Sequence, residues 1–186
     1  MITLSRSILS ISLCLLFGTP GCSKRPAQGP IDACTLIKNA EIEAVQGSPI
    51  RESKSSANTD NGFRVAQCYY AANENNKSVA LTATQRDPEH LTARTAKNVW
   101  DDMFGEAARE KKEGEGEREG EKADAPTKID GVGDEAYWTG ARFGGALYVL
   151  SREKDTFIRI SVGGGDTEES KIEKSKTLAR KAISRL

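Results

Sequence analysis

The sequence predicts an α+β fold, an antiparallel sheet of about five strands built from two hairpins, with three helices packed on it. Two observations predict it. Residues 63–85 and 147–162 each hold two runs of alternating apolar and polar side chains around a polar turn, as in β-hairpins. Residues 31–47, 87–107 and 166–186 instead repeat apolar side chains at helical spacing.

Residues 1–21 have the three parts of a signal peptide. Arg6 supplies a positive charge, residues 8–17 form an apolar run, and residues 18–22 offer small side chains for cleavage. The apolar run is shorter than the ~20 residues that span a bilayer. We therefore expect the chain to be exported and this segment to be removed.

Cys22 is a candidate for lipid attachment. It follows Gly21 directly after the apolar run, which resembles a bacterial lipobox, where the cysteine is acylated and becomes the first residue. Thr19 and Pro20 fit that pattern poorly, so cleavage by an ordinary signal peptidase is the alternative. We expect a lipid anchor in a bacterial membrane, with residues 22–30 as a polar tether.

The chain has four cysteines, of which Cys14 leaves with the signal peptide and Cys22 is the lipid site. Cys34 and Cys68 remain, an even pair in an oxidising compartment, and we expect them to form a structural disulfide. Closing a loop of about 35 residues stabilises a fold by roughly 4 kcal/mol. Free buried thiols are one alternative. A redox or metal site is another, disfavoured because the pair is far apart and the chain has one histidine.

The single domain, residues 31–186, begins with a helix over residues 31–47, broken into two short turns near Asn39. Asp32 is expected to cap the first turn and Asn39 the second. Gly47 suits the end of the helix, since glycine readily adopts the left-handed conformation found there.

Residues 53–62 read as a loop, because they are almost all polar. Two strands follow, residues 63–72 and 78–85, which we expect to pair around a turn at 73–77. In the first of them Ala66, Cys68 and Tyr70 share one face, and Phe63, Val65, Gln67 and Tyr69 share the other.

The second helix is expected to open at Asp87-Pro88, with aspartate as the cap and proline in the first turn. Its apolar stripe carries Trp100 and Phe104, and it frays out near Lys112. Residues 106–124 are almost all charged or glycine, so we read them as a solvated, mobile excursion. A charged segment that binds a partner is the alternative.

The second half of the domain is also expected to contain strands followed by a helix. A glycine-containing turn leads into a short strand at 136–138, then a hairpin of residues 147–151 and 156–162. The last helix is expected to open with a capping box of Asp166 and Glu169. Its buried stripe is Ile172, Ser175, Leu178, Ala179, Ala182, Ile183 and Leu186.

Charge and motifs exclude several function classes. Without residues 1–21 the chain has 26 basic and 27 acidic residues, because Arg6 is the one charge removed, so no basic field points to nucleic acid. His90 is the one histidine, and we read it as a surface residue of a helical first turn. No nucleophile elbow is present, and the glycines at 163–165 lack the Gly-Lys-Ser/Thr ending of a phosphate-binding loop. We predict no catalytic residue, cofactor or metal site.

The best candidate contact surface is the turn at residues 131–138. Two carboxylates and two glycines lie together there, directly before two aromatic residues, and a third carboxylate, Asp130, precedes the turn. The alternative is a tight turn whose glycines take positive φ and whose acids cap amides. The candidate residues are Gly131, Gly133, Asp134, Glu135, Tyr137 and Trp138.

Several short motifs resemble a group of uncharacterised bacterial cell-envelope lipoproteins. The motifs are CTLI at 34–37, AEI at 40–42, VQG at 45–47, CYY at 68–70 and GVGDEA at 131–136. The likeness spans most of residues 31–186, without 106–124. It implies an exported, disulfide-bonded α+β domain and brings no known catalytic residue.

We therefore expect a domain in the periplasm or on the cell surface that binds an envelope protein or glycan, or has a structural role, without catalysis. The alternative is a hydrolase of envelope glycans that uses carboxylates alone, which would need two acids facing each other ~5–10 Å apart.

Overall fold

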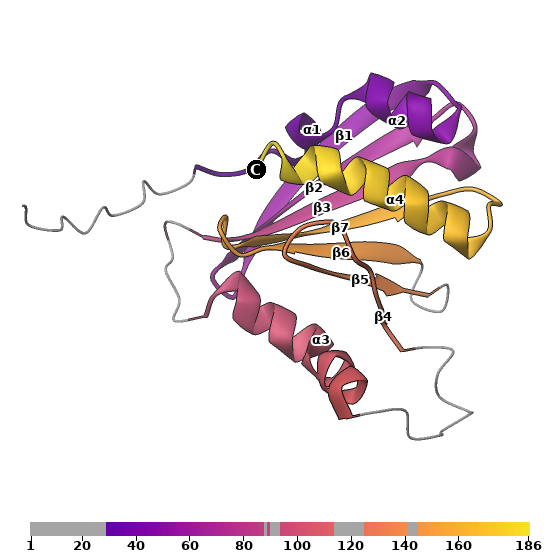
Figure 1. The fold of residues 1–186 in the computed structure, drawn as a ribbon. Helices are drawn as coiled ribbons and strands as arrows, with labels where there is room; N and C mark the ends of the chain where they lie inside the picture. The colour runs from indigo at the N-terminus through magenta and orange to yellow at the C-terminus, as the bar shows by residue number, and fades with distance from the viewer. Residues whose placement is uncertain (1–28, 88, 90–93, 114–124, 141–144) are drawn as a thin grey trace, which may run out of the picture.

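The computed structural model describes residues 29–87, 89, 94–113, 125–140 and 145–186 (Figure 1). The elements, in chain order, are α1 (Ala33–Leu36), α2 (Asn39–Gln46), β1 (Ile50–Asp60), β2 (Phe63–Ala72), the 3-10 turn η1 (Asn75–Lys77), β3 (Val79–Arg86), α3 (Ala96–Glu113), β4 (Thr127–Lys128), β5 (Glu135–Thr139), β6 (Ala146–Ser151), β7 (Thr156–Val162) and α4 (Glu168–Ile183). The signal peptide, Cys22 and His90 lie outside the described residues, as does most of the predicted excursion, 114–124. Within the described ranges no helix is long and apolar enough to cross a membrane.

The strands form one open antiparallel sheet in the order β1-β2-β3-β7-β6-β5-β4. The predicted α+β class and antiparallel sheet are confirmed. The described residues contain seven strands and four α-helices, where five strands and three helices were expected. The additional strands, β1 and β4, form the two edges of the sheet.

The predicted loop at residues 53–62 is wrong, because most of it is β1. Every residue of β1 after Ile50 is exposed, so the strand has no apolar alternation to reveal it. The register is instead set by the two-residue turn Asn61-Gly62, with φ of 48° and 78°, which joins β1 to β2. Asn-Gly is the sequence that favours this kind of hairpin turn.

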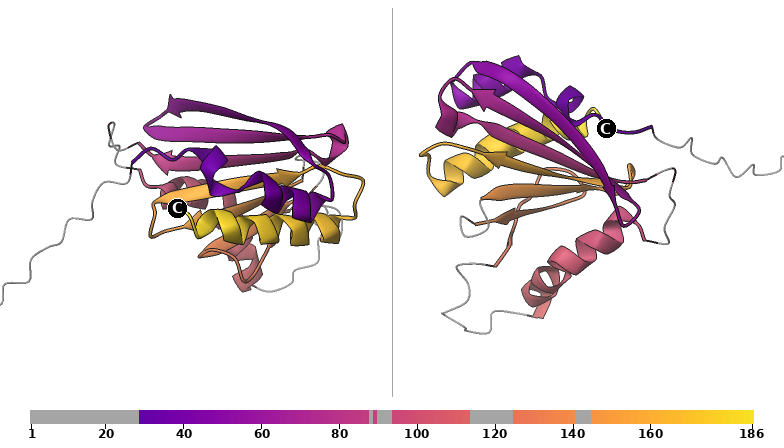
Figure 2. Two further views of the ribbon diagram at one scale, coloured as in Figure 1. Left: turned by 90° about the horizontal axis from the view of Figure 1, so that it is seen from above. Right: turned by 180° about the vertical axis from the view of Figure 1, so that it is seen from behind.

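Helices cover both faces of the sheet. α1, α2 and α4 pack on one side, here the first face, and α3 packs on the other, the second face (Figures 1 and 2). The main core lies under the first face. The alternation predicted for β2, β3 and β7 is confirmed, because the buried set includes Ala66, Cys68, Tyr70, Val79, Leu81, Ala83, Ile158, Ile160 and Val162.

The stripe predicted for the last helix also faces this core. Ser175, Leu178, Ala179 and Ala182 of α4 are fully buried there, and Ile172, Ile183 and Leu186 pack at its margin. Its cap is different from the prediction. Thr167 precedes the helix and its hydroxyl accepts from Ser170 N at 3.3 Å, while Asp166 forms an ion pair with Lys174 at 2.8 Å. That hydrogen-bonded lysine lowers the pKa of Asp166.

The first helical segment is broken in two near Asn39, as predicted. Asp32 caps α1, accepting from Cys34 N at 3.0 Å, and Gly47 ends α2 with φ of 65°. Asn39, however, is the first residue of α2 and not its cap. Lys38 takes that position, and its amide donates to the Glu41 carboxylate at 3.0 Å.

A second, smaller core lies between α3 and the second face. Trp100 and Phe104 pack there on Tyr137, Leu150 and Phe157. The ring centroids of Phe104 and Tyr137 are 4.9 Å apart in a stacked arrangement. This core anchors α3 to β5, β6 and β7.

The predicted start of this helix at Asp87 is wrong, because α3 begins at Ala96. The Asp87 amide donates to Gly62 O at 2.9 Å, which continues the strand direction of β3. The first turn of α3 is capped from elsewhere in the chain. The Asp155 carboxylate, from the turn between β6 and β7, accepts from Ala96 N at 2.7 Å.

Candidate functional site

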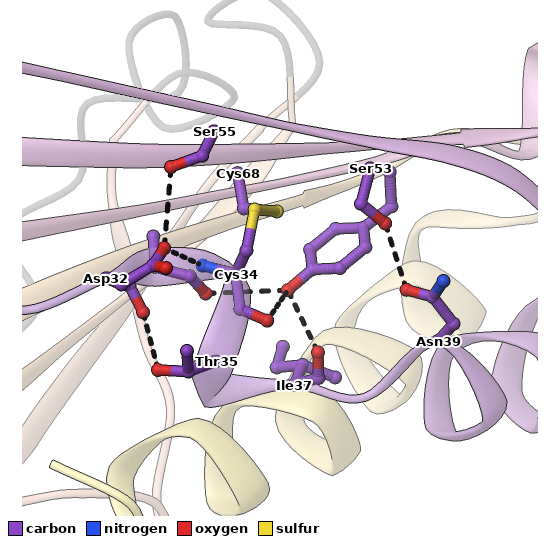
Figure 3. Close-up of a disulfide and its surroundings, with 10 residues drawn as sticks. Asp32, Cys34, Thr35, Ile37, Asn39, Ser53, Ser55 and Cys68 are labelled. Atoms are coloured by element: carbon purple, nitrogen blue, oxygen red, sulfur yellow. Dashed lines mark hydrogen bonds between the residues drawn. A yellow bond between two sulfur atoms is a disulfide. The ribbon is translucent and has the colours of Figure 1, made fainter.

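The predicted disulfide is confirmed. Cys34 of α1 and Cys68 of β2 are bonded, with their Cα atoms 5.0 Å apart (Figure 3). Asp32, which caps α1, adds a polar contact between this helix and the sheet. Asp32 accepts from Ser55 Oγ at 3.4 Å as well as from Cys34 N. The bond fastens the start of the domain to the first hairpin.

Tyr70 lies under the same helix and is fully buried. Its hydroxyl donates to Ile37 O at 3.0 Å, with the carbonyls of Ala33 and Cys34 at 3.4 and 3.5 Å. Burial raises the pKa of Tyr70 to about 12. A neutral phenol that donates to helix-end carbonyls is a structural group. Together with the disulfide, it fixes α1 to β2.

The first described residues, 29–31, lie beside β3. The buried amide of Gln85 fixes this segment through two hydrogen bonds, since its Nε2 donates to Gly29 O at 3.1 Å and its Oε1 accepts from Ile31 N at 3.2 Å. The tether predicted at residues 22–30 therefore ends at a fixed point on the fold. Residues 22–28 of it lie outside the described part of the chain.

The predicted contact turn is held by close contacts. Gly131 and Gly133 take φ of 81° and 59°, and a Cβ at Gly133 would overlap Val149 Cγ1. Asp134 accepts from Arg152 N at 2.7 Å. Glu135 accepts from Trp100 Nε1 at 3.0 Å and pairs with Arg152, which raises the pKa of that guanidinium.

The two aromatic residues of this turn are not surface residues. Tyr137 and Trp138 are 4% and 2% exposed and point to opposite faces of the sheet, the first into the small core and the second into the main core. Successive residues of a strand face opposite sides, and helices cover both sides here. Burial also raises the pKa of Tyr137. Gly131, Gly133 and Asp134 are exposed and remain a predicted contact.

A different surface lies on the second face, beside α3. Its side chains come from β1, β2, β3 and β7, and we call it the open face: Lys54, Ser56, Gln67, Tyr69, Thr82 and Arg159. Four of them form one row across the strands, since Ser56 pairs with Gln67, Gln67 with Thr82 and Thr82 with Arg159. Tyr69 is 42% exposed.

Arg159 is the most distinctive group of the open face. Its Nε donates to Tyr148 Oη at 3.1 Å, and its guanidinium carbon lies 5.8 Å from the centroid of that ring. Tyr148 in turn packs edge-on against Phe104 of α3, at 5.3 Å. Aromatic packing therefore orients the side chain, which is half-buried.

No carboxylate in the described part of the chain pairs with Arg159, and its two terminal nitrogens are neither bonded nor enclosed. A guanidinium presents these nitrogens as a planar fork that fits a carboxylate or phosphate. The open face thus combines an oriented cation with hydroxyl, amide and aromatic groups, a combination that suits an acidic, hydroxylated ligand.

A cleft of about 610 Å³ continues the open face toward the turn between β1 and β2. Val65 and Thr84 in its floor are the next pair along the strands after Gln67 and Thr82. The residues that line it are Asp60, Asn61, Phe63, Val65, Thr84, Arg94 and Val99.

The open face was not predicted as a site from the sequence. Gln67 and Tyr69 were correctly placed on one side of a strand, but β1 was predicted to be a loop, so no continuous surface was expected. The signal that could have found it is the polar alternation of Thr82 and Arg159 opposite apolar residues. In the described ranges, no group of three His, Cys, Asp or Glu residues comes together that could hold a metal ion.

Comparison of the chain with protein-family models, curated proteins and solved structures finds no match in any of the three.

Proposed function

We propose that this protein is an exported domain, anchored to a bacterial membrane by lipid on Cys22, that binds an acidic envelope glycan through the open face without catalysing a reaction. The observation that carries the binding proposal is Arg159, a half-buried and aromatic-oriented guanidinium with no acidic partner in the described part of the chain. The resemblance to envelope lipoproteins is consistent with it.

The disulfide supports export. Disulfides persist in oxidising compartments such as the periplasm and are rare in the reducing cytosol. Cys68 is fully enclosed by the main core, so the bond is part of the folded interior. This fits the signal-peptide pattern of residues 1–21.

The fixed entry of the chain at Gln85 supports a tethered arrangement. From Cys22 to Gly29 a fully extended chain spans roughly 25 Å. A lipid on Cys22 would therefore hold the domain close to the membrane surface, within reach of envelope glycans. Acyl chains on a single residue anchor firmly when there is more than one of them.

The chemistry of the open face supports a glycan as ligand. Sugar hydroxyls bond to amide and hydroxyl side chains such as Gln67 and Thr82, and an exposed ring such as Tyr69 offers a flat apolar surface for a sugar ring. Bacterial cell-wall glycans carry carboxylates, which the fork of Arg159 can bind through two parallel hydrogen bonds.

The alternative, a hydrolase that depends on carboxylates, receives less support. The two acids of the predicted turn are each engaged in a structural contact. Asp134 caps the amide of Arg152, and Glu135 accepts from Trp100. Such contacts suit a rigid turn better than a proton donor and nucleophile facing a substrate.

Binding is tested by sedimenting the purified mature protein with insoluble cell-wall glycan. Wild-type protein should co-sediment, and Arg159→Gln should reduce the apparent affinity about tenfold, the loss typical of one charge-assisted hydrogen-bond pair. Lys171→Gln, which removes one positive charge from α4 on the first face, is the control and should bind like wild type. Equal binding by wild type and Arg159→Gln would contradict the proposed binding face.

The anchor is tested separately by intact mass measurement of the mature N-terminus. An acylated Cys22 as first residue, and release of Cys22→Ser protein from the membrane fraction, are the expected results. An unmodified N-terminus at or beyond residue 22 would show ordinary secretion and would overturn the anchor, leaving the binding test unaffected.

A further inference from the structure

β1 is a long exposed edge strand. It has 11 residues and forms one edge of the sheet, whereas β4, at the opposite edge, has two residues. An edge strand presents a row of unpaired backbone N–H and C=O groups that can pair with another strand. All ten residues from Arg51 to Asp60 are exposed.

The hairpin turn identifies which backbone groups face outward. Asp60 and Phe63 flank the two-residue turn and so bond to each other. Antiparallel pairing alternates along the strand, so Asn58, Ser56 and Lys54 also direct their backbone groups toward β2. The outward-facing groups therefore belong to Ser53, Ser55, Ala57 and Thr59.

The central part of this edge lacks the features that usually block pairing. Edge strands are commonly protected by charged residues, proline or a bulge. Residues 55–59 carry no charge and no proline, and the irregularity of β1 lies earlier, between Ile50 and Glu52. The central part of β1 is thus open to a second strand.

We propose that β1 pairs with β1 of a second copy of this chain, antiparallel and about a two-fold axis at Ala57, so that the two sheets become continuous. The charges select this register. With the axis at Ala57, Lys54 lies opposite Asp60 of the second copy, and Ser56 lies opposite Asn58 of that copy.

Other two-fold registers are less favourable. Opposite residues in a sheet share a face, so the axis must pass through a residue and not between two residues. An axis at Ser55 places Lys54 opposite Ser56, and an axis at Ser56 places Glu52 opposite Asp60, two like charges. Among the described residues of a single copy, Lys54 forms an ion pair with the exposed Glu52, at 3.2 Å, and no residue forms an ion pair with Asp60.

The pairing fits a membrane-anchored protein. A two-fold axis perpendicular to the sheet turns one copy into the other without changing height along the axis. Both chain entries at Gly29 would then lie at one level, so both anchors can reach one membrane. The two open faces would lie side by side, which raises avidity for a polymeric ligand.

A cysteine at the axis tests the proposal in the full-length protein, expressed with its own signal peptide. Residue 57 pairs with itself, with Cα atoms about 5.5 Å apart, within the range for a disulfide. Ala57→Cys should therefore form a reducible dimer on a non-reducing gel. Thr59→Cys is the matched control. Its Cα atoms would be roughly 14 Å apart, so it should stay monomeric.

The register is tested by a charge exchange in the Ala57→Cys background. Lys54→Asp should lower the dimer fraction severalfold, and the double variant Lys54→Asp with Asp60→Lys should restore it. Equal abundance of all variants on reducing gels controls for folding. A dimer fraction for Ala57→Cys no higher than for Thr59→Cys, or cross-links to other proteins alone, would overturn pairing with a second copy. A dimer that the double variant fails to restore would overturn the register.

Discussion

Single residues in this protein often satisfy backbone groups that lie far away in the sequence. Tyr70 of β2 donates to Ile37 O at the end of α1, and Asp155 accepts from the first amide of α3. Gln46 does the same with its Nε2, which donates to Lys77 O at 2.8 Å and Gly163 O at 3.0 Å. These contacts hold irregular segments in place where regular secondary structure ends.

Tyr70→Phe should lower the free energy of unfolding by about 1–3 kcal/mol, because it leaves the Ile37 carbonyl buried without its donor. It should also change the pH dependence. Because the pKa of Tyr70 is raised to about 12, the folded state holds this proton more tightly than the unfolded state does. Its contribution is present below pH ~10 and is lost as the pH rises through ~12.

Denaturant titrations at pH 7 and pH 11 check both effects. Tyr69→Phe, on the exposed side of the same strand, is the control and should leave stability at pH 7 unchanged. The same loss of stability between the two pH values in wild type and Tyr70→Phe would contradict the assignment.

Gly133→Ala should destabilise the protein by about 1–3 kcal/mol. An alanine is strained at the φ of 59° found there, and its Cβ would lie 2.7 Å from Leu150 O. Gly165→Ala is the comparison, since it has no neighbour within 4 Å and no positive φ, and should be close to neutral. Thermal unfolding of the two variants checks this. Similar midpoints for both would mean that the turn at 131–138 adjusts freely.

At the level of elements, α3 depends on a small aromatic core. The main core joins α1, α2 and α4 to the first face, but α3 contributes only a few large side chains to its own contact with the sheet. Trp100 is 1% exposed and Phe104 is 4% exposed. The same aromatic group positions Tyr148 and through it Arg159, so packing of α3 and the open face are linked.

Phe104→Ala should therefore cost about 3–5 kcal/mol, as is typical of a buried aromatic residue. It should also weaken glycan binding, because Tyr148 loses its neighbour. Met103→Ala, one residue earlier and 41% exposed, should change neither quantity appreciably. Denaturant unfolding and the sedimentation assay measure the two effects. A stable Phe104→Ala protein would show that α3 is held by other contacts.

In the whole molecule, distant segments are fastened together at the start of the domain. The disulfide joins residues separated by 34 positions. At the other end of the chain, Arg185 bonds to Leu36 O and to the Glu41 carboxylate, and this pairing lowers the pKa of Glu41 well below its usual range. The first helices are thus held by both the sheet and α4.

Cys68→Ser should lower the free energy of unfolding by about 4 kcal/mol, the chain-entropy value for a loop of this length. The loss should appear in oxidising buffer, and reductant should destabilise wild type while leaving the variant unchanged. Thermal or denaturant unfolding with and without reductant measures it. An unfolding midpoint of the variant equal to that of oxidised wild type would contradict a stabilising role for the bond.

The sequence by itself determined the elements whose burial follows a period. β2, β3, β7 and the stripe of α4 were predicted because their apolar residues alternate or repeat at helical spacing, and burial is what produces such a pattern. Cysteine number and the export signal were enough to predict the pairing of Cys34 with Cys68. Glycine at 47 marked the end of α2, because few other residues adopt its conformation.

Only the tertiary structure decided the rest. β1 has no buried residue after Ile50. It is a strand because it pairs with β2, and this pairing leaves no apolar alternation in the sequence. The start of α3 depends on Asp155, and the burial of Tyr137 and Trp138 depends on helices on both sides of the sheet. The open face spans four strands, and its neighbours β3 and β7 are far apart in the sequence. A surface of this kind exists only once the strands are paired, because no single segment contains it.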